Sequence, residues 1–253
     1  NKNDRVLVLK TNEVKPDTQF GVTLKNIDLE VYQSEILGIG GVAGNGQEEL
    51  MQILTGEKID QSVSLKYMDN DIQMLNPRER REMGLAFAPE ERLGHAAVAN
   101  LNLLENSLIT DPKKRFLKKM GFINFVELNL YTNEIIEKFN VKTTGASALA
   151  SSLSGGNLQK FVVGREIGQK PSLFVVNQPT WGVDALSAAN IRQAVVEIAN
   201  MGAAIILISQ DLDEILEISN KVAFLTNGNL SRPTNTADIK SDEIGAIMGG
   251  ISE

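Results

Sequence analysis

Residues 41–50, GVAGNGQEEL, constrain the fold more than any other part of the chain. They follow an apolar run at 35–40 that suits a strand, and they precede a run at 48–54 that suits a helix. Backbone N–H groups converge on an anion where a glycine loop joins a strand to a helix N-terminus. Gly41, Gly44 and Gly46 stand where the phosphate loop G-x-x-G-x-G-K-[ST] requires glycine. The stretch therefore predicts a phosphate cradle; the alternative is a glycine-rich turn that holds no ligand.

The side chains of this loop do not match its backbone. Gln47 stands in the place of the lysine that reaches the terminal phosphates, and Glu48 replaces the hydroxyl that ligates magnesium. Val42, Ala43 and Asn45 fill the remaining positions. The loop has the shape of a nucleotide site without its charges.

Composition excludes several classes of function. With 32 acidic and 25 basic residues the net charge is -7, and no long basic run is present, so we do not expect nucleic-acid binding. The absence of cysteine and the single histidine, His95, exclude Cys-based or His-rich metal centres. No apolar stretch approaches the length of a membrane span. The start, NKND, lacks an initiator Met and a signal pattern, so we expect a piece of a longer protein.

Strand and helix patterns alternate along the 253 residues, which predicts an α/β domain with a mainly parallel sheet. A stretch at 95–142 has helical patterns and resembles an insertion between two parts of that sheet. The predicted strands lie at 5–9, 22–31, 35–40, 63–68 (an edge strand), 84–88, 172–176, 203–209, 222–225 and 229–230. One predicted helix begins at 76–79, and three others occupy 129–139, 186–200 and 241–248.

A second motif, LSGGNLQK, begins with Leu153, Ser154, Gly155, Gly156 and Asn157. A serine and two glycines ahead of a helix offer a hydroxyl and free N–H groups to a phosphate. Taken alone, the motif favours a plain N-capped helix. Together with the glycine loop, it resembles the signature motif of ATP-binding cassette (ABC) proteins.

Other segments support this resemblance in the family's order. FVVNQPTWGVD at 174–184 resembles the second Walker motif and the D-loop with Asp184, PEER at 89–92 falls at the Q-loop, and ILISQDLDE at 206–214 resembles the switch region. The resemblance covers almost the whole chain. It implies one nucleotide-binding domain over 1–253 with an ABC-type P-loop NTPase fold. A RecA-like core and an antiparallel β subdomain would occupy 1–91 and 166–253, and a helical subdomain 92–165.

The motifs narrow the resemblance to the second half of the double ATPase subunits of simple-sugar and nucleoside importers; APEER and QPT favour the nucleoside branch. The resemblance implies that the first cassette is absent from this chain. It also implies transmembrane permease subunits as partners, an extracellular substrate-binding lipoprotein as an indirect partner, and a peripheral place on the cytoplasmic face of the membrane. Residues 90–106 would then lie near the permease, or else form an ordinary loop.

Compared with the family, the catalytic positions hold Gln47, Glu90, Asn177, Gln178 and Gln210. Gln47 brings no charge, and a charge-assisted hydrogen bond is worth about 1.5–3 kcal/mol. Asn177 is a poorer magnesium ligand than a carboxylate, and losing the base at Gln178 costs about 10²–10⁴ in rate. We therefore expect no catalytic residue, no metal ligand, weak or absent Mg and no useful ATP hydrolysis.

Glu48 adds repulsion: two like charges ~4 Å apart at a dielectric of ~20 repel by about 4 kcal/mol. The alternative is that this carboxylate itself ligates magnesium. Phe20 stands where the family places its base-stacking aromatic, or else is a core or turn aromatic. Trp181 is a packing residue or a partner contact, and a contact role or a solvated position is expected for His95.

Three functions remain in view. The first is a degenerate regulatory cassette that supplies its signature and Asp184 in trans to the partner cassette and holds ATP, another nucleotide or a nucleoside without hydrolysis. The second is a stand-alone ligand-binding regulatory module. The third is an active ATPase with substituted residues.

Overall fold

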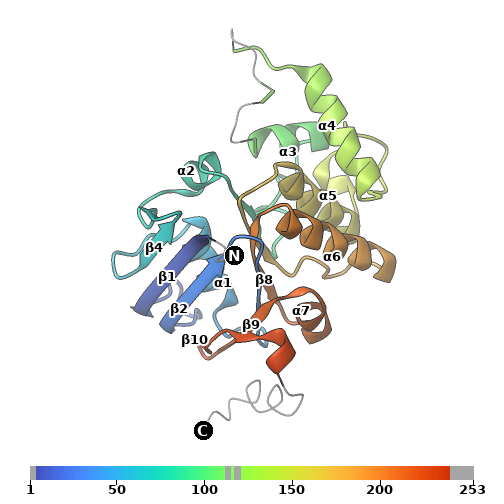
Figure 1. Cartoon of the computed structure of the whole chain (residues 1–253). Helices are drawn as coiled ribbons and strands as arrows, with labels where there is room; N and C mark the ends of the chain where they lie inside the picture. Colours follow the sequence, from blue (N-terminus) through green and yellow to red (C-terminus); the bar gives the residue numbers. More distant parts are fainter. Residues whose placement is uncertain (1–3, 112–114, 117–120, 240–253) are drawn as a thin grey trace.

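The structure, a computed structural model, describes residues 4–111, 115–116 and 121–239 (Figure 1). Its described strands are β1 (Arg5–Val14), β2 (Leu24–Tyr32), β3 (Ile36–Gly40), β4 (Ser64–Tyr67), β5 (Asn70–Asp71), β6 (Leu85–Ala88), β7 (Leu173–Asn177), β8 (Ala204–Ser209), β9 (Lys221–Thr226), β10 (Asn229–Leu230) and β11 (Thr234–Asn235). They form one sheet in the order β5-β4-β1-β2-β10-β9-β3-β8-β7-β6, with β11 paired to β9.

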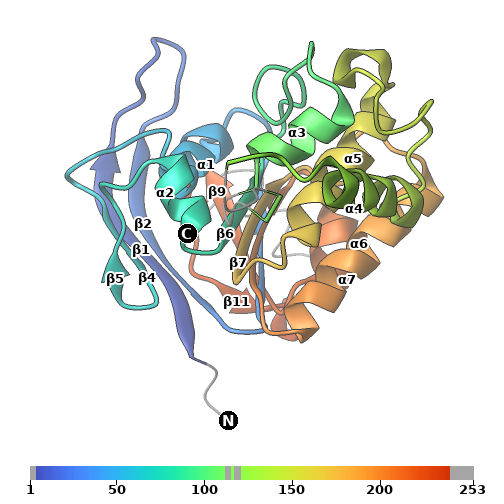
Figure 2. The same ribbon diagram turned by 90° about the horizontal axis from the view of Figure 1, so that it is seen from above.

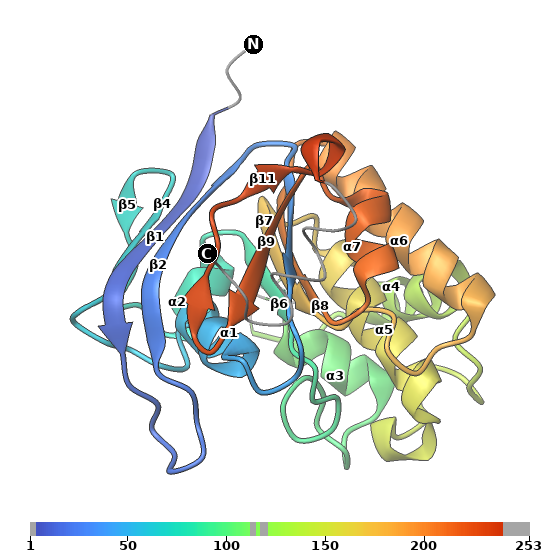
Figure 3. The ribbon, with the colours of Figure 1, turned by 90° about the horizontal axis from the view of Figure 1, so that it is seen from below.

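Helices flank this sheet. They are α1 (Gln47–Thr55), α2 (Pro77–Glu82), α3 (Leu103–Ile109), α4 (Phe125–Lys138), α5 (Gly155–Gly168), α6 (Ala185–Asn200) and α7 (Leu212–Ile218), with 3-10 turns at Ala150–Ser152 and Thr236–Asp238. Figure 2 shows β1, β2, β4 and β5 on one flank of the molecule and α3 to α7 on the other, with the parallel strands between them. α1 lies on the β1–β2 side of the parallel strands, as Figure 3 shows from below.

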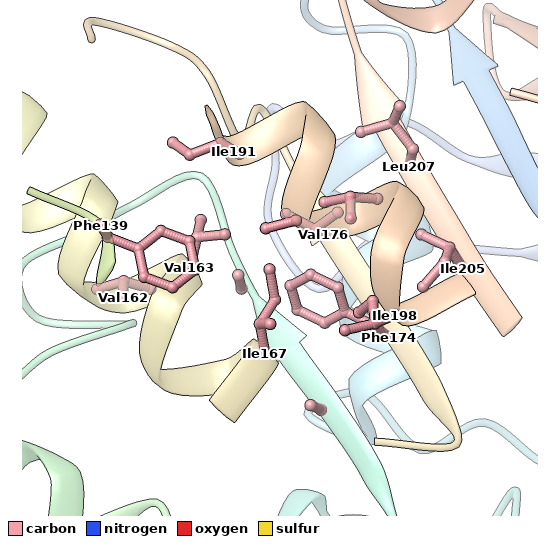
Figure 4. Close-up of a cluster of buried hydrophobic side chains, with 14 of the residues drawn as sticks. Phe139, Val162, Val163, Ile167, Phe174, Val176, Ile191, Ile198, Ile205 and Leu207 are labelled. Carbon is pink, nitrogen blue, oxygen red and sulfur yellow. The ribbon is translucent and has the colours of Figure 1, made fainter. Parts of the chain in front are cut away.

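The parallel strands β6, β7, β8, β3 and β9 are apolar on both faces because both faces are covered. Along β7, Phe174 and Val176 face α5 and α6, whereas Leu173 and Val175 belong to the second cluster, with α1, β1 and β2. Figure 4 shows the first cluster, with side chains from α5 and α6 meeting those of β7 and β8. A fully buried side chain of this kind contributes about 1.5–3 kcal/mol.

The prediction of a mainly parallel sheet is wrong for the other half of the sheet. There β1, β2, β4 and β5 pair antiparallel. β1 continues past the predicted end at residue 9, since its pairing with β2 extends to Val14↔Leu24. β4 is not the edge strand that we predicted. Met68 and Asp69, both with positive φ, turn the chain back as β5, which takes the edge.

Two local predictions are confirmed. Asn76 caps α2 in a reciprocal capping box with Glu79, and Asn227 and Gly228, both with positive φ, turn β9 into β10. The helix predicted at 241–248 lies outside the described residues. The division into subdomains stays a prediction, and its boundary at residue 165 would fall within α5.

Candidate functional site

The glycine loop between β3 and α1 has the backbone of a phosphate cradle. Gly44 and Gly46 have φ of 80° and 111°, a region that disfavours other residues, and Gly46 is the N-cap of α1. A Cβ at Gly41 would lie 2.6 Å from the Leu225 carbonyl oxygen and 2.8 Å from Gln47 Nε2. Glycine is therefore required at these three positions by conformation or by close packing.

The Gln47 side chain closes across this loop. Its Oε1 accepts from the Asn45 backbone N–H at 3.0 Å, and its Nε2 donates to the Val42 carbonyl at 2.9 Å. Asn45 in turn ties the loop to the β9–β10 turn, because its Oδ1 accepts from Asn227 N at 2.7 Å and its carbonyl accepts from Gly228 N at 2.9 Å. Neutral amides thus hold the loop in shape, a role that the sequence did not reveal.

Above the loop lies a cavity of about 680 Å³, which we call the loop cavity. Its lining includes most of the predicted site residues, namely Phe20, Ala43, Gly44, Gly46, Gln47, Glu48, Glu90, Asn177, Gln178 and Gln210. Gly41, Val42 and Asn45 do not line it, and Asn45 Nδ2 donates to the Val42 carbonyl at 2.7 Å within the loop. The sequence did not single out Asp17, Glu49 and Glu57, which also line it. Glu49 accepts from Val22 N at 2.8 Å, which ties α1 to the β1–β2 loop.

Asn177 and Gln178 come together with Gln210 because β7 and β8 are neighbours that end at the same edge of the sheet. Gln210 N donates to Gln178 Oε1 at 3.5 Å, a weak bond. Asn177 is 4% exposed, and its Oδ1 is buried with no hydrogen-bond donor among the described residues. Among the described residues at the end of β7, Asn177 Oδ1 is the one buried side-chain polar atom without a hydrogen-bond partner.

A second cavity, of about 490 Å³, adjoins the first and shares Glu48, Gln52, Glu90 and Asn177 with it. Trp181, 61% exposed, and His95 lie in its lining. His95 Nε2 is 2.7 Å from Glu57 Oε1, and this contact raises the pKa of His95 above its usual value of 6.5. His95 is therefore paired with Glu57, just beyond the end of α1.

The signature residues do not line the loop cavity; they lie at the N-terminus of α5. The Ser154 Oγ accepts from Asn157 Nδ2 at 2.8 Å, and Asn157 Oδ1 accepts from Lys142 N at 2.9 Å. The two bonds hold the Ser154 oxygen as an acceptor, which leaves its O–H free to donate outward. Leu153, before the cap, is half-buried against the first core cluster.

The two signature glycines pack closely against neighbouring groups, Gly155 against a side chain and Gly156 against backbone. A Cβ at Gly155 would lie 2.8 Å from Arg92 Nη1, and one at Gly156 would lie 2.7 Å from the Gly182 carbonyl oxygen. Arg92 also donates to the Trp181 carbonyl and to Gln159 Oε1. The motif is thereby packed against the segment that follows β7.

Gln159 completes this connection, while Asp184 caps the helix that follows. Gln159 Nε2 donates to the Gln178 carbonyl at 3.1 Å and to the Pro179 carbonyl at 3.2 Å. Asp184 caps α6 and accepts from both Ser187 N and Ser187 Oγ, contacts that lower the pKa of Asp184. The signature helix and the end of β7 therefore share one hydrogen-bonded network, which motif spacing alone did not predict.

Two absences hold for the described part of the chain. No group of three or more His, Asp or Glu side chains is arranged to hold a metal ion. No described helix is long and apolar enough to span a bilayer.

The fold and the geometry of the glycine loop together define an α/β domain of the P-loop NTPase class. A sequence model for the family described as ABC transporter matches residues 24–181, and the chain belongs to that family. The predicted ABC-type fold is confirmed by solved structures. An ATP-binding subunit of an ABC transporter superposes with a TM-score of 0.75 at 18% identity, covering 97% of this chain and 94% of that one. A cassette dimer bound to ADP and Pi gives 0.76 at 19% identity, covering 91% and 98%.

Several curated proteins are similar in sequence. The nucleoside import ATP-binding protein NupA of Lactococcus lactis is 34% identical over 98% of this chain and 49% of its own length. The guanosine import ATP-binding protein NupO of Bacillus subtilis is 32% identical, covering 94% and 46%. The glucose import ATP-binding protein of Haloferax volcanii is 32% identical, covering 96% and 45%. The chain spans about half the length of the curated relatives it matches.

Proposed function

We propose that this chain is a hydrolytically silent cassette of a nucleoside or sugar importer, and that it completes the ATP site of a partner cassette. The observation that carries the proposal is the contrast between its two motifs. The signature end of α5 keeps its serine, its glycines and its hydrogen-bonded support. The loop cavity has amides at the positions that would need a lysine and two acids.

The loop cavity does not fit a hydrolysing Mg–ATP site. Gln178 cannot act as a general base, and Asn177 and Gln47 carry no charge. Since phosphoryl transfer depends on charge stabilisation and on a positioned water, we derive no hydrolytic step at this cavity. Glu48 brings no positive charge either; its carboxylate accepts a hydrogen bond from Gln52 Nε2 at 3.2 Å.

At the partner's site the chain would act through α5. Ser154 would donate its hydroxyl hydrogen, and the N–H groups of Gly155 and Gly156 would face the partner's bound phosphates from a helix N-terminus. Asp184 would stand beside them at the start of α6. This role needs a first cassette, which lies outside this chain, together with permease subunits at the cytoplasmic face of the membrane and, indirectly, an extracellular substrate-binding lipoprotein.

The names of the relatives support an import function, and the nucleoside and guanosine importers support the nucleoside branch. The name of the glucose import relative supports sugars as the alternative cargo.

The test is Ser154→Ala in the full-length subunit assembled with its permease. We expect the rate of transport-coupled ATP hydrolysis to fall by about 10²-fold or more, as for loss of a preorganised donor. Ser152→Ala, an exposed serine two residues earlier, is the matched control and should leave the rate unchanged. Hydrolysis at the normal rate in the Ser154 variant would refute the role in trans.

A further inference from the structure

The loop cavity is acidic where a triphosphate needs positive charge. Five carboxylates line it, and no lysine, arginine or histidine of the described chain does. Two of the five have a basic partner, since Asp17 pairs with Lys58 and Glu57 with His95. The other three, at Glu48, Glu49 and Glu90, form no ion pair within the described residues, so the cavity repels phosphate groups.

A further cation, Arg92, does not change this balance. Arg92 lies close enough to Glu90 to feel its charge. Its guanidinium, however, donates to Gln159 and to the Trp181 carbonyl, and it lines only the adjoining cavity. A phosphate over the glycine loop would meet Glu48 at the N-terminus of α1 with no counter-charge.

The loop itself is already occupied by its own side chain. Gln47 takes the Asn45 N–H, a group of the kind that a phosphate oxygen would need. To use that N–H, a phosphate would have to displace the Gln47 amide from two hydrogen bonds. The displaced Gln47 side chain would offer the phosphate no positive charge in return.

The remaining polar atoms considered in the cavity lining are hydrogen-bond acceptors. Asn177 Oδ1 is a buried acceptor without a partner among the described residues, and carboxylate oxygens are also acceptors. Ligand hydroxyl and amino groups can donate to such atoms, whereas fully ionised phosphate oxygens cannot. The lining therefore matches a ligand that carries O–H and N–H groups.

A planar surface lies at the mouth of the same cavity. Phe20, on the loop between β1 and β2, is 94% exposed and lines the cavity. An exposed aromatic ring offers a face on which a nucleobase stacks. The volume of about 680 Å³ lies in the range typical of small-molecule sites.

We propose that the loop cavity binds an uncharged, hydroxyl-bearing ligand with a planar ring, a free nucleoside, and rejects the corresponding triphosphate. This inference rests on the proposed function in so far as the cavity is taken to be non-hydrolytic. It makes the cavity a sensor for an uncharged small molecule within an ATP-driven assembly.

The experiment is calorimetric titration of this chain with adenosine, guanosine and uridine, with their triphosphates with and without Mg²⁺, and with ribose and glucose. We expect at least one nucleoside to bind at least about tenfold more tightly than its triphosphate. Phe20→Ala should weaken nucleoside binding by about fivefold or more. Phe122→Ala, also an exposed phenylalanine but outside the cavity, should have no effect.

Restoring charge should reverse the preference. In the double variant Gln47→Lys with Glu48→Thr, we expect the triphosphate to gain about tenfold or more in affinity relative to its nucleoside. A triphosphate that binds the unmodified chain as tightly as its nucleoside would overturn the inference, and so would binding of the sugars alone or of none of these ligands.

The outcomes separate this inference from the proposed function. Triphosphate binding without hydrolysis would end the inference and leave the silent cassette standing. Turnover of the bound triphosphate would end both.

Discussion

At the scale of single residues, neutral amides have replaced charged groups without disturbing the backbone. Gln47 holds the loop through the Asn45 N–H and the Val42 carbonyl, and Gln178 still accepts from Gln210. The cradle keeps its form because its form depends on glycine conformation and on neutral hydrogen bonds. Its charge depends on side chains that this sequence lacks.

The sole histidine, His95, lines the second cavity and contacts Glu57, which lines the loop cavity. The hydrogen bond that His95 donates to Glu57 raises the pKa of His95, and burial opposes the shift. A raised folded-state pKa means that the stabilisation is fully present below the unfolded value of about 6.5 and is lost as pH rises through the higher folded value.

Glu57→Gln should therefore lower the pKa of His95, measured from its ring resonances by NMR. Because the chain has one histidine, the assignment needs no further variant. The loss of unfolding free energy as the pH rises above about 6.5 should also shrink in the variant. Identical titration midpoints in the two proteins would contradict the assigned contact.

At the scale of elements, one buried arginine fixes the helix that follows the glycine loop. Arg80 of α2 is 1% exposed, and burial lowers its pKa to about 10, so it stays protonated at neutral pH. Its Nη1 donates to the Ile53 and Leu54 carbonyls at 2.5 and 3.0 Å, and its Nε donates to the Leu75 carbonyl at 2.9 Å. A cation at a helix C-terminus also complements the helix dipole.

Arg80→Met should lower the free energy of unfolding by about 3 kcal/mol, because it leaves buried carbonyl groups without donors. Arg78→Met is the matched control on the same helix. Its side chain is 75% exposed in an ion pair with Glu82, so we expect a change within about 0.5 kcal/mol. Urea denaturation of both variants gives the comparison, and equal losses would show that the buried bonds of Arg80 have no special weight.

The elements also show what the sequence could predict. β3, β7 and β8 were found to within a residue or two, because strands buried on both faces are continuous apolar runs with turn residues at their ends. β5 was missed, since two polar residues carry no apolar pattern, and its existence depends on the turn at Met68 and Asp69. The extension of β1 likewise depends on its pairing with β2, which has no local signal.

The same division applies to the site. Motif spacing found ten of the residues that line the loop cavity, because parallel strands and a glycine loop bring their ends together at one edge. It did not find Asp17, Glu49 and Glu57, which reach the cavity from a loop, from the outer turn of α1 and from beyond its end. It also missed the closure of Gln47 over the loop, since a rotamer depends on neighbours in space.

At the scale of the whole molecule, the two functional surfaces are separate but connected. The signature glycines pack against Arg92 and Gly182, and Gln159 joins α5 to the Gln178 and Pro179 carbonyls. A ligand that moves the end of β7 would therefore also move the N-terminus of α5, the surface proposed to face a partner cassette. This connection would let the proposed silent cavity influence the partner's site.

Whether the loop cavity is silent is decided by the steady-state rate of ATP hydrolysis by this purified chain at saturating Mg–ATP. We expect no turnover above the rate without protein. A variant with Gly46→Asp, which blocks the cradle, controls for contaminating ATPases. Hydrolysis at about one turnover per second or faster that disappears in the Gly46 variant would contradict the claim that the cavity is silent.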